Sequence, residues 1–204
     1  MPRQDVSEER RAQILEAALE VFARQGFHDA RMDDIAQASG LSKGALYLYY
    51  KSKDAIIGAL MRTVFSVVIR GVRSIEESDQ PARERILLTT ARFADELERF
   101  AGALPVMLEF YAVAARDRTV RLYLREMYED YTASLARVIE QGMARGEFRV
   151  GDDAVGRATA LIGLWEGITL MWAMAPEAIH WREQATLATV TLLDGLRPPD
   201  AAQN

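Results

Sequence analysis

Residues 32–50 read Met32-Asp-Asp-Ile-Ala-Gln-Ala-Ser-Gly-Leu-Ser-Lys-Gly-Ala-Leu-Tyr-Leu-Tyr-Tyr50, and this stretch decides the fold of the first part of the chain. Its apolar positions predict two short helices, at residues 32–39 and 43–49, with a sharp turn between them. Gly40 suits the turn because glycine adopts positive φ angles without a clash of a Cβ atom. We therefore expect two helices that meet at a fixed angle.

The residues around the turn have roles that agree with this arrangement. Ser42 is the residue type that caps a helix N-terminus through its side-chain oxygen. Ile35 and Leu46 are placed to form the apolar contact between the two helices. The pattern predicts a helix-turn-helix, while two ordinary core helices joined by a glycine turn remain the alternative.

The second helix is expected to expose a polar side that carries Lys43, Gly44 and Tyr47. Residues 42–53 contain three lysines and no acid, although the net charge of the chain is −5. Charges farther apart than about 8 Å are largely screened at physiological salt, so a local positive strip can attract phosphate groups. A helix N-terminus also favours anions. These features indicate a surface that attracts phosphate groups.

The region from Arg11 to Leu60 resembles the DNA-binding region of the TetR family of transcriptional regulators. The matching residues are Ile14-Leu15, Ala17-Ala18, Phe22, Gly26-Phe27, Asp34-Ile35-Ala36, Gly40-Leu41-Ser42-Lys43-Gly44, Leu46-Tyr47 and Tyr49-Tyr50-Lys51-Ser52-Lys53-Asp54. The resemblance implies that the remainder of the chain is a diverse ligand-binding and dimerisation domain, which is identified by its architecture alone.

The resemblance also implies which residues contact DNA, mostly at the phosphate backbone. The positions concerned are Lys43, Gly44, Tyr47, Tyr49 and Lys53. Ser42, at the start of the same helix, belongs to this predicted interface. Leu48 stands where a more polar or aromatic residue is frequent in the family, so it either contacts a thymine methyl group or packs inside the domain.

One position departs from the family pattern. The family often has a pair of threonines before the first helix of the motif, and here these positions are Ala30 and Arg31. Arg31 cannot cap the helix as threonine does, because its side chain has no acceptor. It is predicted to reach a phosphate or a guanine, and the alternative is a solvated surface arginine.

Helical periodicity continues through the rest of the chain, and no stretch alternates as a strand does. Ser7 and Ser52 are predicted to cap the first helix and a long fourth helix. The sequence thus predicts an all-α fold of about nine helices. Residues 1–53 are expected to form a three-helix DNA-binding domain with the helix-turn-helix, and residues 54–204 a larger helical bundle for ligand binding and dimerisation.

The predicted bundle is rich in large polarisable side chains, which line apolar ligand pockets as well as cores. The predicted ligand-binding residues are Met61, Phe65, Phe93, Met107, Phe110, Tyr111, Tyr123, Met127, Tyr131, Trp165, Glu166 and Thr169. For each of them singly, plain core packing is the alternative. Glu109 and Glu166 stand among apolar neighbours, so each either binds a cationic or hydroxylated ligand or pairs with an internal arginine such as Arg92 or Arg116.

Several classes of protein are not supported by the sequence. There is no cysteine, and His28 and His180 lie far apart, so no metal or other cofactor is predicted. No phosphate-binding glycine loop or nucleophile elbow supports an enzyme. The apolar run Leu161–Pro176 carries Glu166 and is shorter than the roughly 20 residues of a membrane helix. With no signal peptide recognised, we expect a cytoplasmic protein that does not enter the membrane.

The last two predicted helices carry more apolar surface than one bundle face can use, which predicts a symmetric homodimer through them. Two copies also suit DNA reading, because paired recognition helices enter major grooves about one helical turn apart. We therefore predict a ligand-responsive repressor that binds a pseudo-palindromic double-stranded DNA operator and is released by an apolar or aromatic small molecule. The alternative is a helical small-molecule-binding or enzymatic bundle that does not bind DNA.

Overall fold

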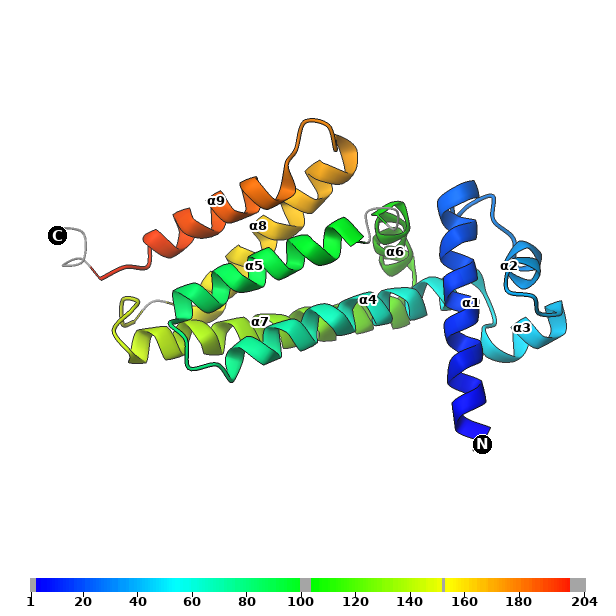
Figure 1. Cartoon of the computed structure of the whole chain (residues 1–204), viewed down its shortest axis with the longest axis horizontal. Helices are drawn as coiled ribbons and strands as arrows, with labels where there is room; N and C mark the ends of the chain where they lie inside the picture. Colours follow the sequence, from blue (N-terminus) through cyan, green and yellow to red (C-terminus); the bar gives the residue numbers. More distant parts are fainter. Residues whose placement is uncertain (1–2, 100–103, 152, 199–204) are drawn as a thin grey trace. The chain divides into compact units, whose positions relative to one another are not determined.

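The computed structural model describes residues 3–99, 104–151 and 153–198, except the side chains at positions 3–6, 64, 65, 67–69, 72, 73 and 105. In these residues there are nine α-helices and no strand (Figure 1), which confirms the predicted all-α fold. The helices are α1 (Arg3–Gln25), α2 (Met32–Ala38), α3 (Lys43–Tyr49), α4 (Lys53–Glu76), α5 (Ala82–Arg99), α6 (Leu104–Arg116), α7 (Arg118–Ala144), α8 (Ala154–Met174) and α9 (Trp181–Asp194).

The first of two compact units is formed by residues 3–66 and 104–124. It contains α1, α2, α3, the first part of α4, α6 and the start of α7. Within it, α2 packs against α1 and α3, and α6 packs against α1 (Figure 1). Completely buried side chains from three of these helices, such as Ile14, Ile57 and Phe110, form its core. Their burial stabilises the frame on which α3 is presented.

The turn and the helix starts predicted around α3 are confirmed. Gly40 has a φ angle of +66°, which a residue with a Cβ atom adopts only with strain. The Ser42 hydroxyl accepts a hydrogen bond from the Ala45 backbone N–H at 3.2 Å. The Ser52 hydroxyl accepts one from the Ala55 N–H at 3.1 Å at the start of α4. Each cap satisfies a backbone donor that the helix itself leaves open.

The start of α1 differs from the prediction. The helix begins at Arg3, so Ser7 is inside it and the prediction of Ser7 as the cap is wrong. Residues 3–6 contain neither glycine nor proline that would end a helix. Serine is also accommodated within helices, where its hydroxyl can bond to the preceding turn, so a single serine marks a helix start only weakly.

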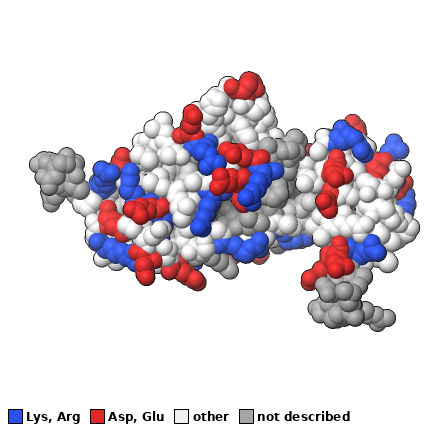
Figure 2. Space-filling view, viewed as in Figure 1, with Lys and Arg blue, Asp and Glu red and all other residues white. Residues whose placement is uncertain are grey.

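The second compact unit is formed by residues 67–99, 125–151 and 153–198. Here α9 packs against both α5 and α8 (Figure 1). On the face shown in Figure 2, Lys and Arg side chains lie among Asp and Glu side chains rather than in a patch of one sign. Exposed ion pairs of this kind contribute little to stability, so packing between the helices holds the unit together.

The end of α4 is held inside this second unit by a buried arginine. The Arg85 side chain of α5 is completely buried. Its Nη1 donates hydrogen bonds to the backbone oxygens of Ile75 and Glu76, at 3.1 and 3.3 Å, and to Gln141 Oε1 at 2.7 Å. Burial lowers the pKa of Arg85. Because these three acceptors come from α4 and α7, Arg85 ties both helices to α5.

Neither unit is one continuous length of chain, because α4 and α7 each contribute residues to both. The predicted division at residues 53 and 54 into a DNA-binding and a ligand-binding domain stays a prediction. Over the described ranges, no helix combines the length and the apolar character that a membrane span requires.

Candidate functional site

The helix-turn-helix of the first unit is built on a buried apolar contact and a hydrogen-bonded turn. Ile35 and Leu46 are completely buried, and Ala36 is nearly so. The turn is closed by the Leu41 N–H, which donates to the Ala36 oxygen at 2.9 Å, and by the Gly40 N–H. The orientation of α3 relative to α2 is therefore fixed by packing and by the backbone.

The predicted interface residues of α3 are accessible. Ser42, Lys43, Gly44 and Leu48 are exposed, and Tyr47 and Tyr49 are half-buried. Nothing lies within 4 Å of a Cβ atom placed on Gly44, so its backbone can be approached closely. Leu48 is 77% exposed, so it does not pack inside the unit. The helical period places Lys43, Gly44, Tyr47 and Leu48 on one side of α3.

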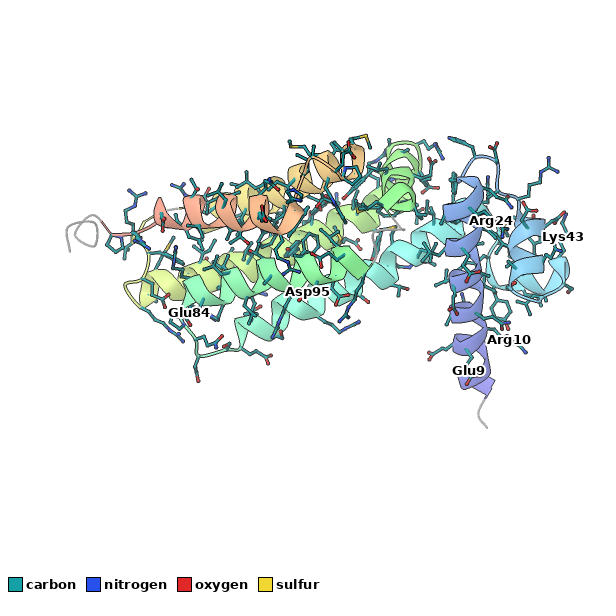
Figure 3. The ribbon with its side chains drawn as sticks, turned by 45° about the horizontal axis from the view of Figure 1, so that its top comes forward. Glu9, Arg10, Arg24, Lys43, Glu84 and Asp95 are labelled. Atoms are coloured by element: carbon teal, nitrogen blue, oxygen red, sulfur yellow. The ribbon has the colours of Figure 1, made fainter. Side chains whose placement is uncertain are left out.

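The Lys43 ammonium is engaged by a carboxylate of the neighbouring helix. Lys43 Nζ lies 2.8 and 3.1 Å from the two carboxylate oxygens of Asp33 at the start of α2. The hydrogen bond and the charge of Asp33 raise the pKa of Lys43. Both side chains are more than half exposed, and Figure 3 shows Lys43 on α3. A phosphate that approaches Lys43 has to compete with Asp33, a residue that the sequence analysis did not select.

Lys53 makes a different set of contacts. Its Nζ donates to the backbone oxygens of Phe27 and His28, at 2.5 and 3.0 Å, and lies 4.7 Å from the centre of the Phe27 ring. These contacts tie the start of α4 to the segment that follows α1. The predicted contact of Lys53 with DNA stays a prediction, and in this structure its ammonium serves the fold.

Arg31 precedes α2 and is exposed. Its side chain forms no cap, in agreement with the expectation from its chemistry. The Asp34 carboxylate instead accepts a hydrogen bond from the Arg31 backbone N–H at 2.8 Å, which closes the first turn of α2 from the other direction. Among the described residues the guanidinium group has no hydrogen-bond or ion-pair partner.

Sequence reasoning missed a cation near the end of α3. The Arg11 guanidinium of α1 lies 5.7 Å from the centre of the Tyr49 ring and 5.6 Å from that of Tyr50. Such cation–π contacts hold an arginine over an aromatic face. The contact joins residues far apart in the sequence, so no local motif indicated it. It places another positive charge beside the predicted interface.

The predicted ligand residues are distributed over both units. In the first unit Met61 and Phe110 are buried, and Met107, Tyr111 and Tyr123 are half-buried. Burial raises the pKa of Tyr123, whose ring centre lies 5.6 Å from the Arg62 guanidinium. Phe65 lies outside the residues whose side chains are described. These placements agree equally with core packing and with a ligand site.

For Glu109, the structure agrees with internal pairing. Its carboxylate lies 3.3 Å from Arg116 Nη2, and its other oxygen lies 3.9 Å from His28 Nε2. Arg116 is one of the two partners that the sequence analysis named. Glu109 is therefore neutralised within the first unit, which weakens the case that it binds a ligand.

The second unit brings several predicted ligand residues together as an aromatic cluster, which we define as Phe93, Tyr131, Trp165 and Trp181. The Trp165 ring stacks on Phe93 and on Tyr131, each with centres 6.2 Å apart. Phe93 also meets Trp181 edge-on at 5.3 Å. Trp181, the first residue of α9, was missed by the sequence analysis. The cluster joins α5, α7, α8 and α9.

A chain of hydrogen bonds satisfies the indole groups of this aromatic cluster. Trp181 Nε1 donates to the Thr169 hydroxyl at 2.8 Å, and Trp165 Nε1 donates to the Thr189 hydroxyl at 3.0 Å. Thr189 in turn lies 3.3 Å from the Thr90 hydroxyl. Buried polar groups need such partners because an unmet one costs about 1–3 kcal/mol. Met127 is also buried in this unit, and Glu166 is half-buried.

An apolar surface of α8 and α9 is left exposed in the second unit. On α8 the exposed residues include Leu170, Met171 and Met174, which are 51–64% exposed. Nothing lies within 4 Å of a Cβ atom placed on Gly163 or Gly167 of the same helix. Such small residues allow the backbone of another helix to approach. The surface has the composition expected of a helix-packing interface.

Two protein-family models match the chain. Residues 14–60 match the model described as bacterial regulatory proteins, tetR family. Residues 82–198, more than half of the chain, match the model described as BetI-type transcriptional repressor, C-terminal. The first match contains α2 and α3, and the second contains α5, α6, α7, α8 and α9.

Known regulators are similar to this chain over 79% of its length or more. The HTH-type transcriptional regulator YfiR of Bacillus subtilis, itself described as uncharacterised, is 29% identical over 79% of this chain and 78% of its own. The crystal structure of a transcriptional regulator from Pseudomonas aeruginosa PAO1 has a TM-score of 0.79 at 27% identity, covering 92% of this chain and 90% of that one. The regulator FadR from Bacillus subtilis, solved with stearoyl-CoA, has a TM-score of 0.76 at 24% identity, covering 91% and 99%.

Proposed function

This chain belongs to the tetR family of bacterial regulatory proteins and is a DNA-binding transcriptional regulator, and we propose that it responds to a ligand and represses transcription as a homodimer on a pseudo-palindromic operator. The observation that carries the proposal is α3, a capped helix behind a glycine turn that exposes Ser42, Lys43 and Gly44. The match to a repressor model supports the sign of regulation. Its place of action is the cytoplasm, where bacterial operators are.

In the proposed complex, α3 enters the major groove with its N-terminus towards a phosphate. Lys43 and the Tyr47 hydroxyl contact the phosphate backbone, and Gly44 lets a backbone N–H approach it closely. Leu48, exposed at the same side of the helix, contacts a thymine methyl group. Arg31 reaches a phosphate or a guanine from the start of α2.

Lys43 and Lys53 differ in the contacts that each must give up in order to bind a phosphate of DNA. Lys43 exchanges one exposed carboxylate, Asp33, for a phosphate, so its ammonium remains paired throughout. Lys53 gives up two backbone oxygens and an aromatic contact if it turns to DNA. We therefore assign the main phosphate contact to Lys43 and minor roles to Lys53 and Tyr49.

The homodimer is proposed to form through α8 and α9. The exposed apolar side chains of α8 need a cover, and the open space at Gly163 and Gly167 lets a second copy of the helix come close. Leu187 extends the apolar surface onto α9. A symmetric contact of this kind presents two α3 helices to one operator.

The effector is proposed to bind in the second unit against the aromatic cluster. Its chemistry is apolar or aromatic, and the structure of a similar regulator with stearoyl-CoA supports an apolar body. Because α4 has residues in both units, it is the proposed coupler between effector and operator. A coupling of about 1–3 kcal/mol, the usual range, would be enough to weaken operator binding 5- to 150-fold.

The proposal is tested by salt-dependent DNA binding. Fragments are first selected from random double-stranded DNA, and the dissociation constant is then measured at several salt concentrations. In the Asp33→Asn background, where no carboxylate competes for the Lys43 ammonium, replacing Lys43 by alanine should lower the slope of log K against log salt by about 1 per subunit. Arg125→Ala is the matched control, because it also removes one exposed positive charge, in the second unit. Absence of any salt-dependent binding would favour the helical bundle that does not bind DNA.

A further inference from the structure

The Tyr131 hydroxyl is an exception in the aromatic cluster. Tyr131 is 5% exposed, and its hydroxyl oxygen has no hydrogen-bond partner among the described residues. The indole N–H groups of Trp165 and Trp181 both have threonine partners, and Thr169 donates onward to the Trp165 backbone oxygen at 2.7 Å. The indole N–H groups of the aromatic cluster therefore have hydrogen-bond acceptors, whereas the Tyr131 hydroxyl has none among the described residues.

A buried water molecule is a poor explanation for this hydroxyl. An interior water usually needs about three hydrogen bonds to protein groups. The threonine and tryptophan groups of this region already bond to one another, so they have little to offer a water. A partner that is itself anchored by apolar contact is a better match, because the Trp165 ring stacks on Tyr131 and also on Phe93.

The charges nearby define the partner further. Burial raises the pKa of the Tyr131 phenol well above its usual value, with a further contribution from the Glu166 carboxylate, so the group is a neutral donor at physiological pH. Its hydrogen needs an acceptor atom, which a quaternary ammonium lacks. An anionic acceptor is repelled by Glu166, which follows Trp165 in α8. An uncharged acceptor atom, such as a carbonyl or ether oxygen, remains.

We propose that Tyr131 is the polar anchor of the effector site and donates a hydrogen bond to an uncharged carbonyl or ether oxygen of a ligand whose apolar body lies against Trp165 and Phe93. That this ligand is the effector of the regulator rests on the proposed function, whereas its chemical class follows from Tyr131 and its neighbours. A free carboxylate at the same position is disfavoured. The aromatic rings supply most of the contact, and the single hydrogen bond selects among apolar compounds.

The first test needs no ligand. Tyr131→Phe removes the unmet hydroxyl and keeps the ring, so the melting temperature of the unliganded protein should rise by about 2–6 °C. Tyr128→Phe, the same change one turn earlier on α7, is the control and should give no rise. A fall in melting temperature for Tyr131→Phe would show that the hydroxyl has a partner in the folded chain, and this would overturn the proposal.

The second test uses three probes of one shape in equilibrium dialysis without DNA. They are 2-acetylnaphthalene with an uncharged carbonyl, 2-naphthoate with a carboxylate, and 2-ethylnaphthalene with no acceptor. The unmodified protein should bind the ketone about tenfold more tightly than the other two, and Tyr131→Phe should bind ketone and hydrocarbon alike. Equal binding of all three probes, or a preference for the carboxylate, would overturn the proposal.

The two proposals fail separately. Dialysis contains no DNA, so the absence of a ketone preference leaves operator binding untouched. Loss of operator binding in the salt titration leaves the dialysis result standing. As a last step, the ketone should release the operator from the unmodified protein and from Tyr128→Phe. Tight binding of the ketone without release would overturn the assignment of Tyr131 to an effector site.

Discussion

Replacing Asp33 by asparagine should make operator binding tighter and more dependent on salt. In the free protein Asp33 holds the Lys43 ammonium at 2.8 and 3.1 Å. Asparagine keeps the shape of the side chain but removes the charge, so Lys43 reaches a phosphate without a competing carboxylate. The side chains of Lys43 and Asp33 are 62% and 59% exposed, so the exchange should have little effect on folding.

The size of the effect follows from counterion release. Each phosphate that a protein neutralises adds about 0.9 to the slope of log K against log salt. One freed Lys43 in each of two subunits therefore steepens the slope by up to about 1.8. Between 50 and 200 mM salt, a fourfold change, the ratio of the two dissociation constants should shift by about 12-fold. The variant should show its greatest advantage at the lowest salt concentration.

Fluorescence anisotropy with a labelled operator fragment measures both slopes. Glu84→Gln is the matched control, because Glu84 is also an exposed acid in the first turn of a helix, α5, and lies in the second unit (Figure 3). Its slope should equal that of the unmodified protein. Parallel slopes for Asp33→Asn would refute the phosphate contact of Lys43. Weaker binding confined to operators with a cytosine at one position would instead assign Asp33 to reading its amino group.

Two further predictions concern the second unit. Gly142→Ala should lower the free energy of unfolding in urea by about 1–3 kcal/mol, because the added Cβ would lie 2.5 Å from the Phe148 ring; Gly71→Ala, with nothing within 4 Å, should not be destabilising. Leu170→Glu should convert the proposed dimer to a monomer in sedimentation velocity, since it places a charge in the apolar surface of α8. A variant that remains dimeric would remove α8 from the interface.

The local geometry around α3 was predictable from the sequence because its causes are local. A glycine at the turn and a serine three residues before the N–H that it caps act within a few bonds, and the structure has both. The bounds of α3, Lys43–Tyr49, also agree with the prediction. Where the signal was a single polar residue without a turn beside it, as at Ser7, the helix extended past it.

The partners of the interface charges were not predictable in the same way. Lys53 donates to the backbone oxygens of Phe27 and His28, and Lys43 pairs with the Asp33 carboxylate. In each case the ammonium meets its acceptor only once the helices have packed. All three lysines of the chain lie in residues 43–53. Their clustering predicts a positive strip. In the structure the Asp33 carboxylate pairs with Lys43, and two backbone oxygens accept hydrogen bonds from Lys53.

The predicted ligand residues show a second limit of sequence reasoning. Large aromatic side chains form cores and pockets alike, and Phe110 and Trp165 are both almost completely buried, so neither composition nor burial separates the two roles. Hydrogen bonding separates them better. Only with the partners of Trp165 and Trp181 known does the unmet hydroxyl of Tyr131 become visible.

The interleaved chain path of the two units limits how the regulator can be re-engineered. Scission after residue 53 would discard Ile56, Ile57 and α6, which complete the same unit as α1 to α3. A fragment of residues 1–53 would then expose apolar side chains that α4 and α6 cover in the whole chain. Chimeras with a new operator preference are better made by exchanging the exposed side chains of α3, which leaves the buried contacts between the helices unchanged.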